Sequence, residues 1–158
     1  MVRLADLHPE EAAGMRNAIG RFELPDFGAV PWLTPPPLAE SKLALLTTAA
    51  LHRRDDRPFR FGDHGYRLIP DDIDPADLVQ AHVSVNFDRT HYQRDHNVVL
   101  PLDRLHELAE AGEIGAISET HFSVQGATPN PINFEPAAAD IAQRMHDLDV
   151  TSALLVPV

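Results

Sequence analysis

Histidine and aspartate side chains gather between residues 82 and 96 of this sequence, and these side-chain types can carry acid–base catalysis or hold a divalent metal. The set consists of His82, Asp88, His91, Asp95 and His96. Imidazole and carboxylate groups are ligands for zinc, iron or manganese, although the set matches no defined ligand spacing such as HExxH. The sequence therefore allows a metal site, for instance for zinc, built from His82, His91 and His96.

The same stretch allows acid–base chemistry without a metal. Apolar and polar residues alternate from residue 79 to residue 88, which predicts a half-buried strand. His82 and Asp88 fall on its polar face, and a carboxylate close to an imidazole can fix the tautomer of the ring and tune its pKa. We expect His82 to be the acid–base residue, oriented by Asp88 and Asp95. A hydrogen-bonded structural histidine at the end of a sheet fits the same pattern.

Three further side chains are candidates for binding a substrate. A guanidinium pairs with a carboxylate through two hydrogen bonds, so Arg67 is a candidate carboxylate clamp, and a structural ion pair is the alternative. His121 lies near the end of a predicted strand, and His52 follows an earlier one. Folds with a parallel sheet place their ligands at the carboxyl ends of the strands, which favours both histidines as substrate contacts.

Composition excludes several classes of function. The chain contains no cysteine, which rules out disulfides, thiolate metal ligands and cysteine nucleophiles among its 158 residues. A formal net charge of -11 disfavours nucleic acid and anionic membranes as partners. No apolar run is long enough to span a bilayer, and the first residues lack the apolar stretch of a signal peptide. We expect a cytoplasmic protein.

Hydrophobic periodicity predicts alternating strands and helices. Apolar or alternating runs predict strands at 43–46, 79–88, 114–124 and 151–156, and helical spacing predicts helices from Pro9 and over 102–109 and 138–148. The alternation favours a single three-layer α/β domain, with a small, mostly parallel sheet of about four strands flanked by helices.

The chain divides into a lead-in and this α/β domain. Residues 1–37 form an N-terminal helix and a proline-rich segment, which we expect Trp32 to pin to the core, and residues 38–158 form the domain. We expect a pocket at the carboxyl ends of the strands, lined by the candidates His82, Asp88, Asp95 and His121. The long segment 52–75 is predicted to be its lid.

Short motifs from about residue 38 onward resemble, in order and spacing, those of a known family. Residues 42–51 (KLALLTTAAL) resemble its ALVTTAG strand, and residues 61–70 (FGDHGYRLIP) resemble its GD-x-SYR-x-IP segment. His82, Asp88 and RDHNVVLPLDRL at 94–105 resemble its H…D…RDxNxVFPIDRL block. The motifs EAGEIG, FSVQG and DVTSALLVPV resemble EGxIG, FxxxG and GVDAVLLTPV. The family is the selenoprotein B type of the glycine/sarcosine/betaine and D-proline reductases.

The resemblance implies a reductase-like α/β domain and an enzyme of reductase ancestry that acts on a small amino-acid-like substrate. In this family a Cys- or selenocysteine-x-x-Cys motif follows the last matched block, and these residues contain none. Three explanations stay open: a product ended at a selenocysteine codon, a short paralogue that lost the redox step, or a pocket repurposed for His/Asp chemistry.

Two other functions stay open beside the acid–base enzyme. One is a metal-dependent lyase or hydrolase that uses the same His/Asp cluster, and the other is a non-catalytic binding or assembly subunit. The expected partners are a small-molecule substrate and either further copies of the chain, as a homo-oligomer, or a partner subunit.

Overall fold

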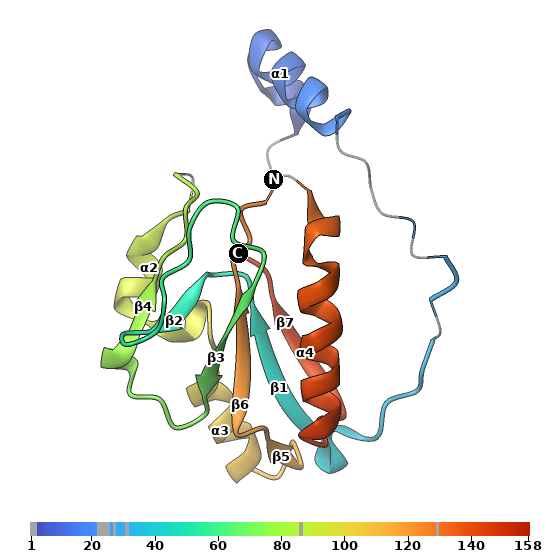
Figure 1. Cartoon of the computed structure of the whole chain (residues 1–158), viewed down its shortest axis with the longest axis vertical. Helices are drawn as coiled ribbons and strands as arrows, with labels where there is room; N and C mark the ends of the chain where they lie inside the picture. The colour runs from blue at the N-terminus through green and yellow to red at the C-terminus, as the bar shows by residue number, and fades with distance from the viewer. Residues whose placement is uncertain (1–2, 22–25, 27, 31, 86, 129) are drawn as a thin grey trace.

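A mostly parallel five-stranded sheet forms the centre of the computed structural model, which describes residues 3–21, 26, 28–30, 32–85, 87–128 and 130–158 (Figure 1). Its strands are β1 (Lys42–Thr47), β3 (Tyr66–Pro70), β5 (Ala116–Ile117), β6 (Thr120–Val124) and β7 (Ser152–Val156). β1 pairs in parallel with β7 on one side and with β5 and β6 on the other, and β3 is antiparallel to β6. A separate ribbon pairs β2 (Leu51–Arg53) with β4 (Leu78–Gln80).

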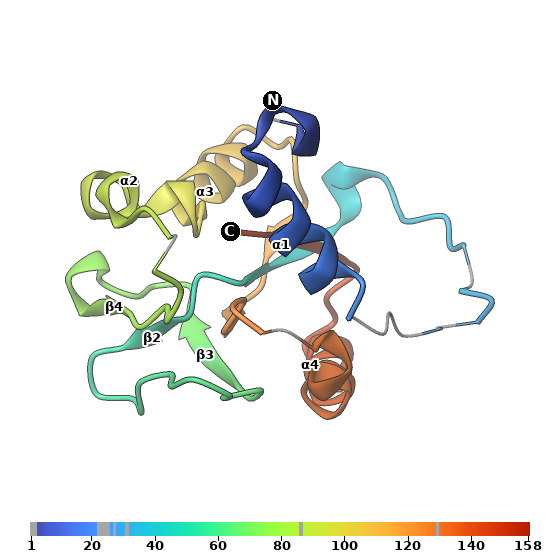
Figure 2. The same cartoon turned by 90° about the horizontal axis from the view of Figure 1, so that it is seen from above.

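Helices cover both faces of this sheet, which confirms the predicted three-layer α/β architecture (Figure 2). The helices are α1 (Pro9–Ile19), α2 (Arg89–Arg94), α3 (Leu102–Glu110) and α4 (Glu135–Asp147). Short 3-10 turns connect the elements: η1 (Leu4–Asp6), η2 (Leu38–Glu40), η3 (Pro75–Asp77), η4 (His96–Val98) and η5 (Pro131–Phe134). No helix in the described ranges is both long enough and apolar enough to cross a membrane.

Alternate side chains of β1 supply the two halves of the core. Leu43 and Leu45 pack on the side of α3, where Leu102 and Leu105 are buried. Ala44 faces the other way, toward the cluster around α4. The run Leu-Ala-Leu-Leu is apolar on both faces because a central parallel strand is covered on both sides. The predicted helix ends are also confirmed: Pro101 precedes α3, and Gly112 follows it with a φ of 71°.

The strand predicted over 79–88 is mostly wrong. Only β4 is a strand, because its partner β2 is three residues long and offers no further ladder. Beyond it, the Ala81 N–H bonds to the Ala50 carbonyl and the side chain of Gln125 donates to the Ala81 carbonyl, so the chain is held by isolated bonds. The predicted alternation of buried apolar and exposed polar side chains is also not observed, since the apolar Val85 is exposed and the polar His82 is buried. Asn86 lies outside the described residues.

Two other strand predictions need correction. The stretch 114–124 is split into β5 and β6 by Ser118 and Glu119. β7 lies where it was predicted, but it is an edge strand rather than a buried one: in the described part of the chain it pairs with β1 alone, and Leu155 is 64% exposed. An apolar run therefore marked a strand correctly but did not distinguish a central strand from an edge strand.

The expectations for the lead-in and for the lid also change. Trp32 is 96% exposed, so it does not pin residues 32–37 to the core; this segment runs outside α4 to the start of β1 (Figure 1). Within the segment 52–75, β3 is part of the main sheet, so this stretch is not a free lid. The division at residue 37 stays a prediction, and Pro25 and Pro31 lie outside the described residues.

Candidate functional site

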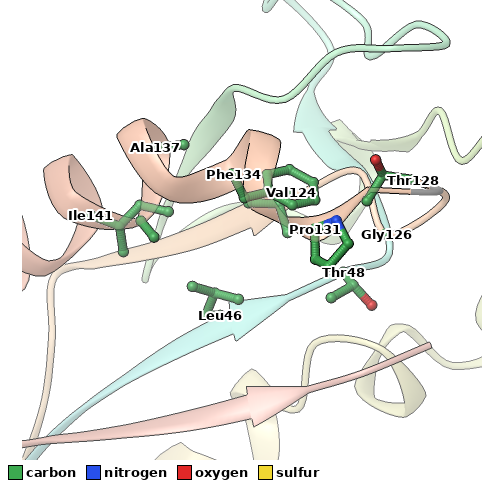
Figure 3. A pocket seen from close by; sticks show the side chains of 10 residues that line it. Leu46, Thr48, Val124, Gly126, Thr128, Pro131, Phe134, Ala137 and Ile141 are labelled. Atoms are coloured by element: carbon green, nitrogen blue, oxygen red, sulfur yellow. The ribbon is translucent and has the colours of Figure 1, made fainter. Parts of the chain in front are cut away.

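A pocket opens at the ends of β1 and β6, between the sheet and α4, with a volume of about 520 Å³ (Figure 3). Its walls are apolar: Leu46 comes from β1, Val124 from β6, and Phe134 and Ile141 from η5 and α4. β1 and β6 are parallel neighbours, so their carboxyl ends meet at this edge of the sheet. The position agrees with the expected one, but none of the four predicted lining residues contributes to this pocket.

The loop after β6 forms one side of the pocket mouth by approaching β1 closely. The Gly126 N–H donates to the Thr48 carbonyl at 3.0 Å. A Cβ atom on Gly126 would lie 2.8 Å from the Thr48 Cβ and 2.9 Å from its carbonyl oxygen, which is closer than van der Waals contact allows. Glycine is therefore required here for steric reasons, and the loop then brings Thr128 to the mouth (Figure 3).

His64 is an ionisable side chain beside this mouth. Its Nε2 lies 3.4 Å from Thr128 Oγ1 and 3.4 Å from Asn133 Nδ2, and its ring meets Phe134 edge-on with centroids 5.6 Å apart. The first turn of α4 also borders the pocket, but it continues directly from η5: the Glu135 N–H donates to the Ile132 carbonyl, and Pro136 has no N–H to offer. Sequence analysis missed His64 because the GD-x-SYR motif leaves its position open.

His82 is buried, and its ring stacks against Phe87 with centroids 4.6 Å apart. Its Nδ1 accepts the Ser84 N–H at 3.3 Å, so the neutral ring carries its proton on Nε2, and that atom has no hydrogen-bond partner among the described residues. Burial, and secondly the charge of Arg89, lower the pKa of His82 below its usual value. The ring is therefore neutral at pH 7.

Asp88 and Asp95 do not orient His82, in contrast to the expectation. Asp88 caps α2 by accepting the Thr90 N–H at 2.8 Å, and Asp95 caps η4 by accepting the Asn97 N–H at 2.9 Å. Hydrogen bonds from the Thr90 N–H and side chain lower the pKa of Asp88, and those from the Asn97 side chain and N–H lower the pKa of Asp95. An aspartate just before a helix satisfies backbone donors that are otherwise unpaired, and that local role accounts for both residues.

His121 is fully buried, and both of its ring nitrogens are occupied. Its Nδ1 accepts the Leu45 N–H from β1 at 3.0 Å, and its Nε2 donates to Asp71 Oδ1 at 3.1 Å. The same oxygen lies 3.1 Å from Nε2 of His106. Burial lowers the pKa of His121, although Asp71 acts in the opposite direction. The predicted substrate contact is thus a structural bridge between strands, and no ring nitrogen is free for a ligand.

Arg67 and His52 are likewise engaged inside the protein. Arg67 pairs with Asp63 at 2.8 Å, donates to the carbonyls of Arg57 and Tyr66, and lies over the Phe59 ring. Arg67 therefore forms a structural ion pair, which was the alternative to the carboxylate clamp. His52 is buried, with its Nδ1 2.7 Å from the carbonyl oxygen of Arg53.

The residues proposed as metal ligands do not converge. His91 is exposed and 3.9 Å from Asp88, and His96 lies 3.7 Å from Asp103, whereas His82 is buried against Phe87. Across the described ranges, no group of three or more His, Cys, Asp or Glu side chains is placed to hold a metal ion. The geometry therefore gives no support to the zinc hypothesis.

Comparison with known proteins connects this architecture to one family. A family model described as glycine/sarcosine/betaine reductase selenoprotein B matches residues 65–157. The chain is also similar to D-proline reductase subunit gamma of Acetoanaerobium sticklandii, with 29% identity over 133 residues that cover 78% of this chain and 54% of the relative. It therefore spans about half the length of that relative. No solved structure matches the chain.

Proposed function

Because this chain belongs to the glycine/sarcosine/betaine reductase selenoprotein B family, we propose that it is a ligand-binding and assembly part of a reductase. Its ligand is a small amino-acid-like compound, held in the pocket at the carboxyl ends of β1 and β6. The observation that carries the proposal is this pocket, which combines apolar walls with polar groups at one end.

The chemistry of the pocket fits a zwitterion with an apolar body. Leu46, Val124 and Ile141 suit methyl groups or a ring. Thr128 and the neighbouring His64, at the mouth, offer hydrogen-bonding groups to a carboxylate. Glycine, sarcosine, betaine and D-proline, the compounds that name the family and the relative, carry no net charge near neutral pH. The negative surface of this chain therefore does not repel them.

The proposal assigns no thiol or selenol step to these residues. The 158 residues contain no cysteine, so the chain itself contributes binding, orientation and exclusion of water around a ligand. The relative is by its name one subunit of an enzyme with several, which supports a partner subunit here.

A surface for such a partner is the outer edge of β7. The stretch 151–158 that contains this strand carries no charged side chain. Charged side chains and prolines are common devices against edge pairing, and neither occurs within β7 itself. The opposite edge strand β3 contains Arg67, which is paired with Asp63 beside it. The uncharged edge therefore favours addition of a strand from a partner.

Direct titration with glycine, sarcosine, betaine and D-proline tests the binding function. We expect saturable binding of at least one compound, with a Kd of about 1 mM or below, measured by calorimetry or by NMR. Ala137→Phe fills the pocket and should weaken this binding at least about tenfold, whereas Ala142→Phe, on an exposed face of the same helix, should not. Equal binding by both variants, or no binding of any compound, contradicts the proposal.

A second candidate, acid–base catalysis by His82, is favoured by its buried Nε2, whose proton meets no acceptor in the part of the chain that the structure describes. A buried donor without an acceptor costs about 1–3 kcal/mol, and a ligand oxygen would satisfy it. Because His82 does not line the pocket at the ends of β1 and β6, this candidate places the ligand elsewhere, against the His82 ring. We then expect saturation with the bound compound to shift the ¹⁵N resonance of His82 Nε2 and to leave that of exposed His91 unchanged. An unchanged His82 resonance at full saturation would exclude contact between this ring and the ligand.

A further inference from the structure

The pocket between the sheet and α4 is larger than the compounds that name the family. Its volume of about 520 Å³ is typical of pockets that take drug-sized molecules. Glycine has no apolar side chain, and sarcosine adds a single methyl group. A ligand of that size leaves most of the apolar wall in water, and a wall that stays in water adds nothing to the affinity. The volume therefore favours a ligand with a larger apolar body.

Polar and apolar groups lie at opposite ends of this pocket. Thr48 and Thr128 are at the mouth, whereas Leu46 and Ile141 are at the other end (Figure 3). Leu46 precedes Thr48 by two residues of extended chain, which is about 7 Å at ~3.3 Å per residue. The pocket is thus deep enough for a side chain of several carbon atoms behind a polar head group.

Small residues of the walls leave this space open. Ala137 and Ala138 each contribute a single methyl group from the first turn of α4, and Gly126 contributes no side chain. None of the lining residues in the described part of the chain is charged. A charged side chain of a ligand would enter the apolar end without a counter-ion, which is unfavourable. The walls therefore select against amino acids with charged side chains.

Thr128 is the side chain of the mouth that is most available to a ligand. Its Oγ1 lies 3.4 Å from His64 Nε2 and 3.4 Å from the Asn130 carbonyl oxygen, and both distances are long for hydrogen bonds of a hydroxyl group. A carboxylate can therefore compete for this hydroxyl. Thr48 Oγ1, in contrast, accepts the Val158 N–H at 2.9 Å. These contacts place the head group of the ligand beside Thr128.

We propose that the pocket binds amino acids with large apolar side chains, of the size of leucine or phenylalanine. The carboxylate lies at Thr128, and the side chain extends toward Leu46 and Ile141. This inference rests on the proposed function for the amino-acid head group and narrows the class of ligand. Most of the affinity then comes from burial of the apolar side chain against the walls.

Calorimetric titration with glycine, alanine, valine, leucine and phenylalanine, in both enantiomers where they exist, tests the inference. Each added methylene of a buried aliphatic side chain should tighten binding about fourfold for one enantiomer, so leucine should bind about a hundredfold or more tightly than glycine. Lysine, whose side chain is long but charged, should bind no more tightly than alanine. Similar affinities along the series, or tight binding of lysine, would overturn the inference.

A variant that fills part of the apolar wall separates the side chain from the head group. Ala137→Leu should weaken the binding of leucine and phenylalanine at least about tenfold, and should change that of the smallest compound that binds by less than about twofold. Ala142→Leu, on an exposed face of the same helix, should leave every affinity unchanged. An equal loss for small and large compounds in Ala137→Leu would contradict selection by size.

The exposed Trp32 provides a further control. This side chain is 96% exposed, so Trp32→Ala should leave the affinity for leucine unchanged. Tighter binding by this variant would mean that the chain's own segment 32–37 competes for the apolar end, which would also overturn the inference.

The same titrations distinguish this inference from the proposed function. If one of glycine, sarcosine, betaine and D-proline binds but the affinity does not rise with the apolar side chain, the proposed function stands and the inference falls. If leucine or phenylalanine binds and none of those four compounds does, the inference stands and the four are not ligands. If no amino acid binds, both fall.

Discussion

Replacing His121 with alanine is expected to lower the free energy of unfolding by about 3–5 kcal/mol. The ring fills a gap in the ladder of β1, which pairs with β5 at Lys42 and Leu43 and with β6 only from Leu46. Without the ring, the N–H of Leu45 is buried and unpaired, Asp71 loses a donor, and a cavity opens in a fully buried position. Each of these three changes by itself destabilises the folded state.

Urea unfolding of three variants checks this result. His91→Ala is the matched control, because that ring is exposed, and it should change the unfolding free energy by less than about 0.5 kcal/mol. Asp71→Asn keeps an oxygen that can accept from His121 Nε2, so a loss of about 1–2 kcal/mol is expected. A loss below about 1 kcal/mol for His121→Ala would show that the bridge is not structural, and the ring would again be a candidate for ligand contact.

Breaking the ion pair between Arg67 and Asp63 should have a similarly large effect. Their side chains are only 10% and 8% exposed, and the Nη2–Oδ2 distance is 2.8 Å. Arg67→Met leaves the buried Asp63 carboxylate with the Gly65 N–H and with one cation, the exposed Arg57, and we expect a loss of about 3–5 kcal/mol. The double variant Arg67→Met/Asp63→Leu removes both charges and should recover at least half of this loss.

Arg53→Met provides the control for this pair. Arg53 also forms an ion pair, with Asp55, but these side chains are 47% and 68% exposed, so the expected loss is about 0–1 kcal/mol. Urea unfolding measures all of these variants. If Arg53→Met and Arg67→Met lose equal unfolding free energy, burial does not set the strength of the ion pair between Arg67 and Asp63.

The pH dependence of stability gives an independent measurement of the same pair. Burial would raise the pKa of Asp63, but hydrogen bonds from Arg67 and Gly65 and the charge of Arg67 outweigh it and lower that pKa. The folded pKa therefore lies below the unfolded value of about 3.9, so the contribution is present above that pH and is lost as the pH falls through the folded pKa. Asp63→Asn should flatten the acid limb of the stability curve below about pH 4, and an unchanged limb would contradict this.

Local sequence patterns determined most of the framework. Apolar runs and helical spacing located β1, α3, α4 and β7, because burial on one or both faces leaves its period in the sequence, and Pro101 and Gly112 marked the ends of α3. The alternation of strands and helices in the sequence also predicted a pocket at the carboxyl edge of the sheet, because parallel strands connected by helices bring their ends together.

The tertiary structure decided what each polar side chain does. His121 and Arg67 have the residue types of a binding site, but other groups of the protein occupy both side chains. The partners of His121, the Leu45 N–H and Asp71, lie 76 and 50 residues away in the sequence. Arg67 is held within its own stretch of chain, by Asp63 and the Phe59 ring. His64 meets Asn133 across 69 residues of sequence. Periodicity reports which face of an element is buried, whereas the role of an imidazole or guanidinium depends on which atoms the fold places within hydrogen-bond distance of it.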